Sequence, residues 1–205
     1  MRKIPFMPTE HIQAASLCLL AEYGRKYGEM VAPPVPVEAV LEAHLGLGLD
    51  FDDLPGLVGV PDVLGATWIQ DRRILVDQSL DPEESSAREG RYRFTLAHEV
   101  GHWELHRRFF LEDAAQPSLF GEKKAPSIVC RTSSRKEPME WQADSFAGFL
   151  LMPKEMVLKA WEAQNDSLDP YIAAAEMADL SARWGLAGNP LVTRGRKFRG
   201  FSFFV

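Results

Sequence analysis

The stretch Phe94-Thr95-Leu96-Ala97-His98-Glu99-Val100-Gly101-His102 places a His-Glu-x-x-His pattern inside an apolar run that is typical of a helix. Residues four apart lie on one face of a helix, about 6 Å from each other. His98 and His102 can therefore each direct a ring nitrogen at one metal ion, at the ~2.0–2.1 Å that zinc prefers. Glu99 lies beside them, where it can take a proton from a water molecule at the open position of the ion. A chance match in a chain of this composition is on the order of one in a hundred, so we interpret the pattern as a metal site.

Two small residues in the same stretch indicate how this helix packs. Ala97 precedes the pattern and Gly101 lies within it, and both have little or no side chain. Small residues allow a ligand helix to lie close against its neighbour, so we expect close packing of this helix.

A third protein ligand is expected from the stretch Glu140-Trp141-Gln142-Ala143-Asp144. Glu140 and Asp144 are four apart, so a helix presents both carboxylates on one face. One carboxylate can bind the metal while the other accepts the free N–H of a ligand histidine and fixes its tautomer. His106 is the alternative third ligand, but a straight helix places it about 12 Å along the axis from His98, too far to share an ion. We therefore favour Glu140 as the ligand.

These motifs, read together, closely resemble those of a known family. Arg93 to His102, then Glu140-x-x-Ala143-Asp144-x-Phe146-Ala147 and Leu150-Leu151-Met152-Pro153, are similar to the ImmA/IrrE family of metallo-endopeptidases, small gluzincin-like zinc peptidases. The resemblance covers roughly residues 35 to 160 and leaves the first 30 and last 40 residues without such support. It implies a zincin-like (minigluzincin) domain with one zinc per chain, whose third ligand is a glutamate on a second helix.

The resemblance also implies a substrate. It would be a bacterial or phage transcriptional repressor with a helix-turn-helix domain, and its cleavage would relieve repression. In zincins an edge strand of the sheet pairs with the extended backbone of the substrate. No substrate-specific feature is visible in the residues themselves.

Composition restricts the class of protein. The chain has 205 residues, of which 46% are apolar and 25% charged, and this is ordinary for one soluble globular domain. A formal charge of −6 argues against direct binding of nucleic acid, which needs a basic surface. The two cysteines, Cys18 and Cys130, have no metal-binding spacing and are expected to be free thiols in a reducing compartment. With neither a signal peptide nor a membrane span in view, we expect a cytoplasmic protein.

Periodicity predicts an α+β fold with a small, mainly antiparallel sheet packed on two motif-bearing helices, and additional helices at both ends. Apolar residues that recur at three and four predict helices at 9–25, 37–45, 91–108, 137–151, 154–164 and 171–184. Alternating residues predict strands at 47–51, 66–70 and 74–76, the last two joined in a hairpin by Asp71-Arg72-Arg73. Residues 113–138 are expected to form a long connection that could wall the cleft.

The predicted division of the chain follows from these elements. Residues 1–160 would form the zincin-like peptidase domain, including the N-terminal helices. Residues 161–205 would form a helical appendage packed on the same domain, with a basic and aromatic end.

The mechanism predicted from these residues is metal-assisted hydrolysis of an amide bond. Zinc held by His98, His102 and Glu140 would polarise the scissile carbonyl, and Glu99 would act as the general base. Asp144 would orient one ligand histidine. His106 and Arg131 are the candidates for stabilising the oxyanion.

Two alternatives belong to other classes of protein. The first is a non-catalytic module that binds a regulator and carries a structural zinc; Glu99 argues against it, because a structural site needs no general base. The second is a toxin-like member of a two-gene toxin–antitoxin pair, which the identity of the neighbouring gene would distinguish.

Overall fold

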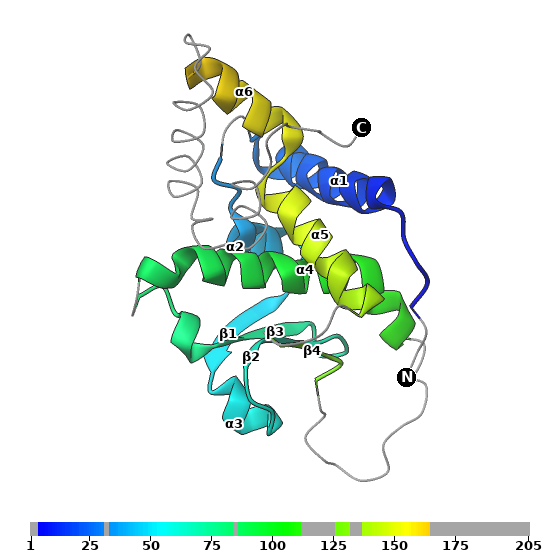
Figure 1. Ribbon diagram of the computed structural model, residues 1–205, viewed down its shortest axis with the longest axis vertical. Helices are drawn as coiled ribbons and strands as arrows, with labels where there is room; N and C mark the ends of the chain where they lie inside the picture. The colour runs from blue at the N-terminus through cyan, green and yellow to red at the C-terminus, as the bar shows by residue number, and fades with distance from the viewer. Residues whose placement is uncertain (1–3, 31–32, 84–85, 112–125, 132–136, 165–205) are drawn as a thin grey trace, which may run out of the picture.

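The computed structural model describes residues 4–30, 33–83, 86–111, 126–131 and 137–164. In the described residues the chain forms two layers, a sheet and a set of helices (Figure 1). The helices are α1 (Thr9–Tyr27), α2 (Val37–Ala39), the π-helical turn η1 (Val40–His44), α3 (Leu54–Val58), the 3₁₀ turns η2 (Gln78–Leu80) and η3 (Ser86–Arg88), α4 (Glu89–Leu111), α5 (Pro138–Leu151) and α6 (Lys154–Gln164). The strands are β1 (Gly48–Asp52), β2 (Val63–Trp68), β3 (Arg73–Asp77) and β4 (Ile128–Arg131).

The four described strands form one sheet in the order β1-β3-β2-β4. β2 pairs antiparallel with β3 on one side and with β4 on the other, so that Thr67 faces Ile74 and Ile128. The predicted hairpin is therefore confirmed. Its first strand lies earlier in the chain than predicted, because the turn takes up residues 69–72 and includes Arg72 at a φ of 52°. The α+β class and a zincin-like arrangement are confirmed.

β1 differs from its predicted setting within an antiparallel sheet. It pairs parallel with β3, Leu49 opposite Ile74, although the other two pairings keep the sheet mainly antiparallel. The alternation of apolar residues also predicted Phe51 to be buried. Phe51 instead lies on an edge strand, 37% exposed, and its ring stacks on Tyr92 at a centroid distance of 5.6 Å.

Two elements were not predicted. α3 begins after Asp53, whose carboxylate accepts a hydrogen bond from the backbone N–H of Gly56, with a proline in the first turn. β4 lies within the stretch that the sequence predicts to be an irregular connection, 113–138, and that prediction is wrong for residues 128–131. The predicted helix at 171–184 and the basic and aromatic end lie outside the described residues. The division of the chain near residue 160 stays a prediction.

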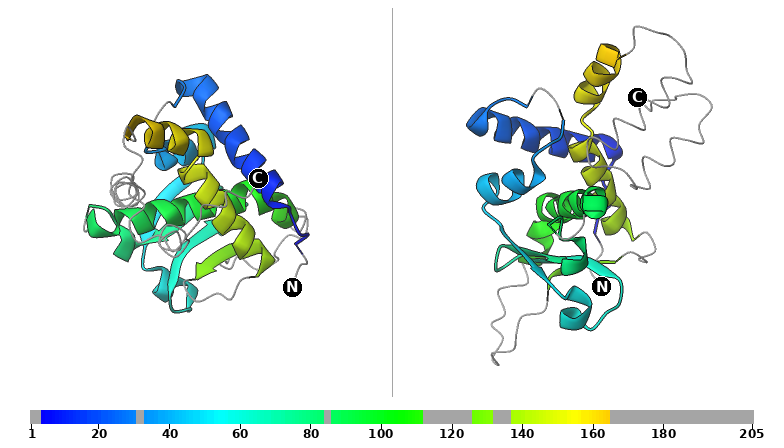
Figure 2. Two further views of the ribbon diagram at one scale, coloured as in Figure 1. Left: turned by 45° about the horizontal axis from the view of Figure 1, so that its top comes forward. Right: turned by 90° about the vertical axis from the view of Figure 1, so that its left-hand side faces the viewer.

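Helix α4 lies between the sheet and the other helices, and it is buried on both sides. The sheet covers one face, and α1 and α5 lie on the other (Figures 1 and 2). All nine residues from 95 to 103 are buried, so this part of the helix has no solvent-facing stripe. The His-Glu-x-x-His motif thus lies in the core. No helix in the described ranges is long and apolar enough to cross a membrane.

The contact between α4 and α5 is unusually close at one position. A Cβ atom added to Gly101 would lie 3.2 Å from the Cα and the carbonyl oxygen of Ala143 and from the Cβ of Phe146. The neighbouring atoms are mostly backbone, so they cannot rotate away. α4 therefore lies close against α5 at Gly101, in keeping with the small residues in its motif.

This contact yields a prediction for stability. Gly101→Ala should lower the free energy of unfolding by about 1–3 kcal/mol relative to Gly24→Ala, because overpacking forces α4 and α5 apart. Gly24 is the matched control: it lies within α1, a Cβ atom added there would lie 3.6 Å from its nearest outside neighbour, and alanine favours helix by up to about 1 kcal/mol. Urea unfolding of the metal-free proteins measures both. Equal stability of the two variants would contradict the tight contact.

Candidate metal centre

The side chains of His98 and His102 project from α4 toward α5, where they meet Glu140. The Nε2 atoms of the two histidines are 2.9 Å apart. One carboxylate oxygen of Glu140 lies 3.3 Å from Nε2 of His98, and the other lies 3.4 Å from Nε2 of His102. All three side chains are buried. The structure thus brings together the three residues that the sequence predicts to be ligands.

The geometry of this group fits a metal ion. The ligand atoms of His98, His102 and Glu140 lie within 4.8 Å of one another. Ligands ~2.0–2.1 Å from a tetrahedral zinc are roughly 3.3 Å apart, close to the separations of 2.9, 3.3 and 3.4 Å found here. The group could hold a metal ion with little movement of its side chains.

Burial and hydrogen bonding set the charge of this group. Burial, together with the neighbouring His98, lowers the pKa of His102 to about 4, so His102 is neutral near pH 7. Burial raises the pKa of Glu140, but its interactions with the neighbouring His102 and His98 outweigh burial and hold that pKa well below its usual range. A neutral imidazole beside a carboxylate is a donor set that suits a divalent cation.

Each histidine also has a partner at its second ring nitrogen. Nδ1 of His98 lies 2.9 Å from the Oδ1 atom of Asp144, one turn after Glu140 on α5. Nδ1 of His102 lies 3.1 Å from Nδ1 of His106. Asp144 therefore lies where the sequence predicts an orienting carboxylate, although its contribution stays a prediction.

His106 does not join the ligand group. Its Nδ1 atom faces His102, and its Nε2 atom lies 2.9 Å from Oε1 of Gln142 on α5. Gln142 was not singled out in the sequence, although a polar residue one turn before Phe146 on a core-facing helix is a signal that could have indicated it. The backbone of Arg131 ends β4 opposite Val63. The side chain of Arg131 lies outside the described part of the structure, so its predicted contact with an oxyanion remains untested.

Glu99 points away from α5 and toward the sheet. Its Oε2 atom accepts a hydrogen bond of 2.6 Å from the hydroxyl of Thr67 on β2. Its Oε1 atom is buried and has no hydrogen-bond partner in the protein. A Cβ atom on Gly65 would lie 2.5 Å from Oε1, so a side chain at this position of β2 would displace the carboxylate. The unpartnered oxygen is a place where a water molecule could bind.

The pKa of Glu99 is raised to about 7, and burial is the main cause. The proximity of His98 and the hydrogen bond from Thr67 lower the pKa, while the charge of Glu140 raises it. A carboxyl group with a pKa near neutrality can both accept and return a proton at physiological pH.

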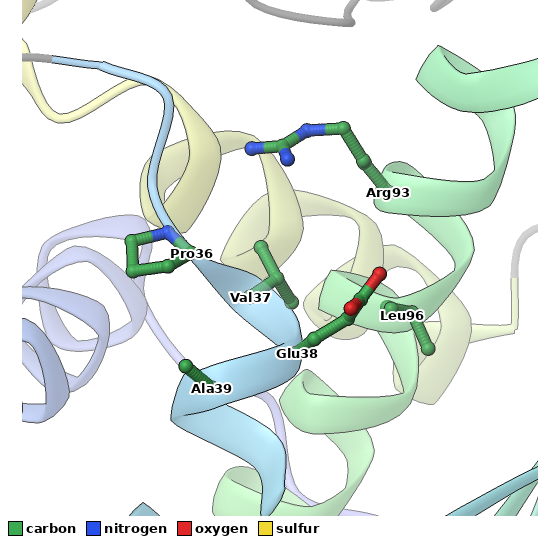
Figure 3. A pocket seen from close by; sticks show the side chains of 6 residues that line it. All are labelled: Pro36, Val37, Glu38, Ala39, Arg93 and Leu96. Carbon is green, nitrogen blue, oxygen red and sulfur yellow. The ribbon is translucent and has the colours of Figure 1, made fainter. Parts of the chain in front are cut away.

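A separate pocket of about 220 Å³ lies on another side of α4. Its lining comes from α2, the residue before it, and the first half of α4 (Figure 3): Pro36, Val37, Glu38, Ala39, Arg93 and Leu96. Arg93 donates a hydrogen bond of 2.7 Å to the carbonyl of Val35. None of the ligand-group residues lines this pocket, so we assign the chemistry to the buried group between α4 and α5.

Comparison with known proteins adds one finding. A sequence profile of the Peptidase M78 family, described as the IrrE N-terminal-like domain, matches residues 65–187, which is more than half of the chain. The matched region starts in β2 at Gly65 and includes α4 and α5, so it contains every residue of the candidate centre. No curated protein matches the chain.

The raised pKa of Glu99 gives a prediction for the metal-free protein. A carboxyl group whose pKa rises from 4.5 to about 7 on folding costs stability above pH 7, and that cost fades as pH falls toward 4.5. Glu99→Gln keeps the shape and removes the charge. Its free energy of unfolding should exceed that of wild type by about 3 kcal/mol at pH 8, and by less than half of that near pH 5.5.

Unfolding in a chelating buffer at both pH values measures this difference. Glu10→Gln, at an exposed position of α1, is the control and should change little at either pH. A wild type as stable as Glu99→Gln at pH 8 would show that Glu99 is not held as a buried charge.

Proposed function

The chain belongs to the family of IrrE N-terminal-like M78 peptidases, and on that premise we propose that it is a zinc-dependent endopeptidase that cleaves a helix-turn-helix transcriptional repressor. A metallopeptidase type of function follows from the family. One observation carries the proposal for this chain: two imidazole nitrogens and a carboxylate converge on one point, and a second carboxylate with an unpartnered oxygen lies beside them.

The metal would be held by His98, His102 and Glu140. When bound, zinc would polarise the scissile carbonyl and lower the pKa of a water molecule toward neutrality. Nδ1–H of His98 donates to Asp144, which keeps Nε2 of His98 unprotonated and directed at the ion. His102 is neutral for the reason given above, so its ring needs to lose no net proton on binding.

Glu99 would act as the general base. Thr67 holds one oxygen of its carboxylate, and the other oxygen is free to accept a proton from the attacking water. Glu99 lies next to His98 in the chain but points about 100° away from it around the helix, so it can reach the water without binding the ion. The same carboxyl group would then return the proton to the leaving amine.

The substrate backbone would pair with β4. The described sheet has two edges, β1 and β4. Glu99 contacts β2, and β4 is the next strand, about 4.8 Å away, whereas β1 lies two strand spacings from β2. An extended peptide added to β4 would thus lie at the edge nearer the general base. The choice of a repressor as substrate is supported by the resemblance of the motifs to the ImmA/IrrE family.

The first test is metal content. Protein purified without chelator should carry close to one zinc per chain, and His102→Ala should lose most of it, because a buried ligand cannot be replaced by solvent. Elemental analysis after dialysis into zinc-supplemented buffer measures both. Wild type and variant that are equally free of zinc would exclude the proposed site.

A second test separates the two carboxylates of α5. Glu140→Gln should weaken zinc binding more than Asp144→Asn, because Glu140 would touch the ion and Asp144 only its ligand. Outer partners typically change metal affinity or activity by about 10–100-fold. The side chain of Asp144 is also 45% exposed, so water can take its place. Competition with a zinc chelator ranks the zinc affinities of the two variants. A lower affinity of Asp144→Asn than of Glu140→Gln would exchange the two assignments.

A third test decides between an enzyme and a module that sequesters its regulator. Glu99→Gln should keep zinc, fold and partner binding, while cleavage falls by roughly 10²–10⁴, the usual contribution of general-base catalysis. Glu104→Gln is the matched control, since Glu104 lies on the same helix and pairs with Arg107.

The measurement is a reporter gene under the control of the candidate helix-turn-helix regulator, with a gel of the regulator itself. On the enzyme proposal Glu104→Gln derepresses and Glu99→Gln does not. Full derepression by Glu99→Gln with the regulator left intact would falsify proteolysis and favour sequestration.

A further inference from the structure

A continuous chain of hydrogen bonds connects the candidate ligand His102 to the N-terminal segment. It runs from Nδ1 of His102 to Nδ1 of His106 over 3.1 Å, and from Nε2 of His106 to Oε1 of Gln142 over 2.9 Å. The amide nitrogen of Gln142 then donates to the backbone carbonyl of Pro5 over 2.9 Å. The side chains of His102, His106 and Gln142 are fully buried, and the last bond, to the exposed Pro5, is half-buried.

The carbonyl of Pro5 fixes the direction of every bond in this chain. A carbonyl can only accept, so the NH₂ group of Gln142 must face it and Oε1 must face His106. Oε1 can only accept as well, so Nε2 of His106 carries the proton. A neutral His106 then has its lone pair on Nδ1, and Nδ1 of His102 must donate to it.

The directions of these hydrogen bonds also determine the tautomer of His102 in the ligand group. A neutral His102 that donates from Nδ1 has its lone pair on Nε2, the atom that lies 3.4 Å from Glu140 and 2.9 Å from His98. That is the tautomer a metal ion needs. The opposite tautomer would place a proton on Nε2 and leave Nδ1 of His102 and Nδ1 of His106 without a hydrogen between them.

The two ligand histidines are oriented by different kinds of partner. His98 meets the carboxylate of Asp144, which is half exposed and carries its own charge. His102 meets an uncharged chain that ends on the main chain of residue 5, outside α4 and α5. The orientation of His102 therefore depends on where the N-terminal segment lies.

The N-terminal segment is held against α5 beside this chain. The ring of Phe6 stacks on Trp141, the residue before Gln142, at a centroid distance of 6.2 Å and an interplanar angle of 10°. Met7 packs on the main core. In Figure 1 the dark blue segment before α1 descends toward the ends of α4 and α5. Phe6 is 75% exposed, so its stacking is a contact that can be removed without opening the core.

We propose that His106 and Gln142 are positioning residues for the metal site, and that residues 5–7 set its affinity by supplying the carbonyl that fixes the tautomer of His102. This inference rests on the metal site of the proposed function. It adds that part of the metal affinity is determined by a segment that contributes no ligand.

The test uses three variants of the full chain. Gln142→Met keeps the length of the side chain and removes both hydrogen bonds. Phe6→Ala weakens the hold of the N-terminal segment and changes no residue of the hydrogen-bonded chain. Ser145→Ala is the matched control: it also removes a hydrogen bond from α5, the one that Ser145 donates to the carbonyl of Trp141, but it touches no member of the chain.

Two quantities are measured: the zinc affinity, by competition with a chelator, and the protonated ring nitrogens of His102 and His106 in the metal-free protein, by nitrogen-15 NMR. Wild type should show protons on Nδ1 of His102 and Nε2 of His106. Gln142→Met should mix the tautomers of His102 and weaken zinc binding by about 10–100-fold. Phe6→Ala should act in the same direction by a smaller factor, and Ser145→Ala should match wild type.

The outcomes separate this inference from the proposed function. A wild type that binds no zinc contradicts the proposed metal site. A wild type that binds zinc, with a Gln142→Met variant of equal affinity or unchanged tautomers, contradicts the positioning role alone. If Gln142→Met does not fold, Phe6→Ala decides, since a variant at this exposed ring with unaltered zinc affinity would overturn the contribution of residues 5–7.

Discussion

Helices α4 and α5 meet almost backbone to backbone at Gly101 and Ala143, and the positions of the groups in the candidate centre follow from that contact. Because the helices are this close, the carboxylate of Glu140 on α5 lies 3.3 Å from Nε2 of His98 and 3.4 Å from Nε2 of His102 on α4. The same closeness brings Asp144 to His98 and Gln142 to His106. A Cβ atom at position 101 would push against main-chain atoms, and three separate hydrogen-bonded or ligand contacts would lengthen together.

One short stretch of α4 presents polar side chains to two neighbouring elements, α5 and β2. Residues four apart, His98, His102 and His106, face α5, whereas Glu99 is turned by about 100° and faces β2. Both faces must then be covered, and polar groups in the core are costly unless they are hydrogen-bonded. Among the described side chains of α4, two buried polar atoms have no hydrogen-bond partner, Nε of Arg93 and Oε1 of Glu99. The atom on Glu99 lies in the candidate centre, where a functional group is expected to depart from good packing.

How much could be predicted depended on whether a feature was local. The helical period alone placed His98 beside His102 and Glu140 beside Asp144, and the pairs are found as predicted. The period also placed His106 too far along the helix to share an ion with His98, in keeping with its bonds away from the ligand group. It could not show that Gln142, 36 residues away, would take the other nitrogen, because that pairing depends on how α5 docks. β4 was missed for the same reason: its short apolar pattern becomes a strand only by pairing with β2, and the parallel pairing of β1 has no local signal.

The position of Glu99 is the physical argument for a catalytic metal site rather than a structural one. A structural metal site is complete with its ligands and the groups that orient them, and Glu99 belongs to neither set. Its burial raises its pKa to about 7, so as an ionised group it lowers the stability of the fold, and an apolar side chain of similar size would pack beside Thr67 at less cost. A Cβ atom on Gly65 of β2 would also displace its carboxylate. A carboxylate that binds no ion and lowers stability contributes nothing to a site that only holds metal. It contributes a great deal to one that must move a proton next to that metal.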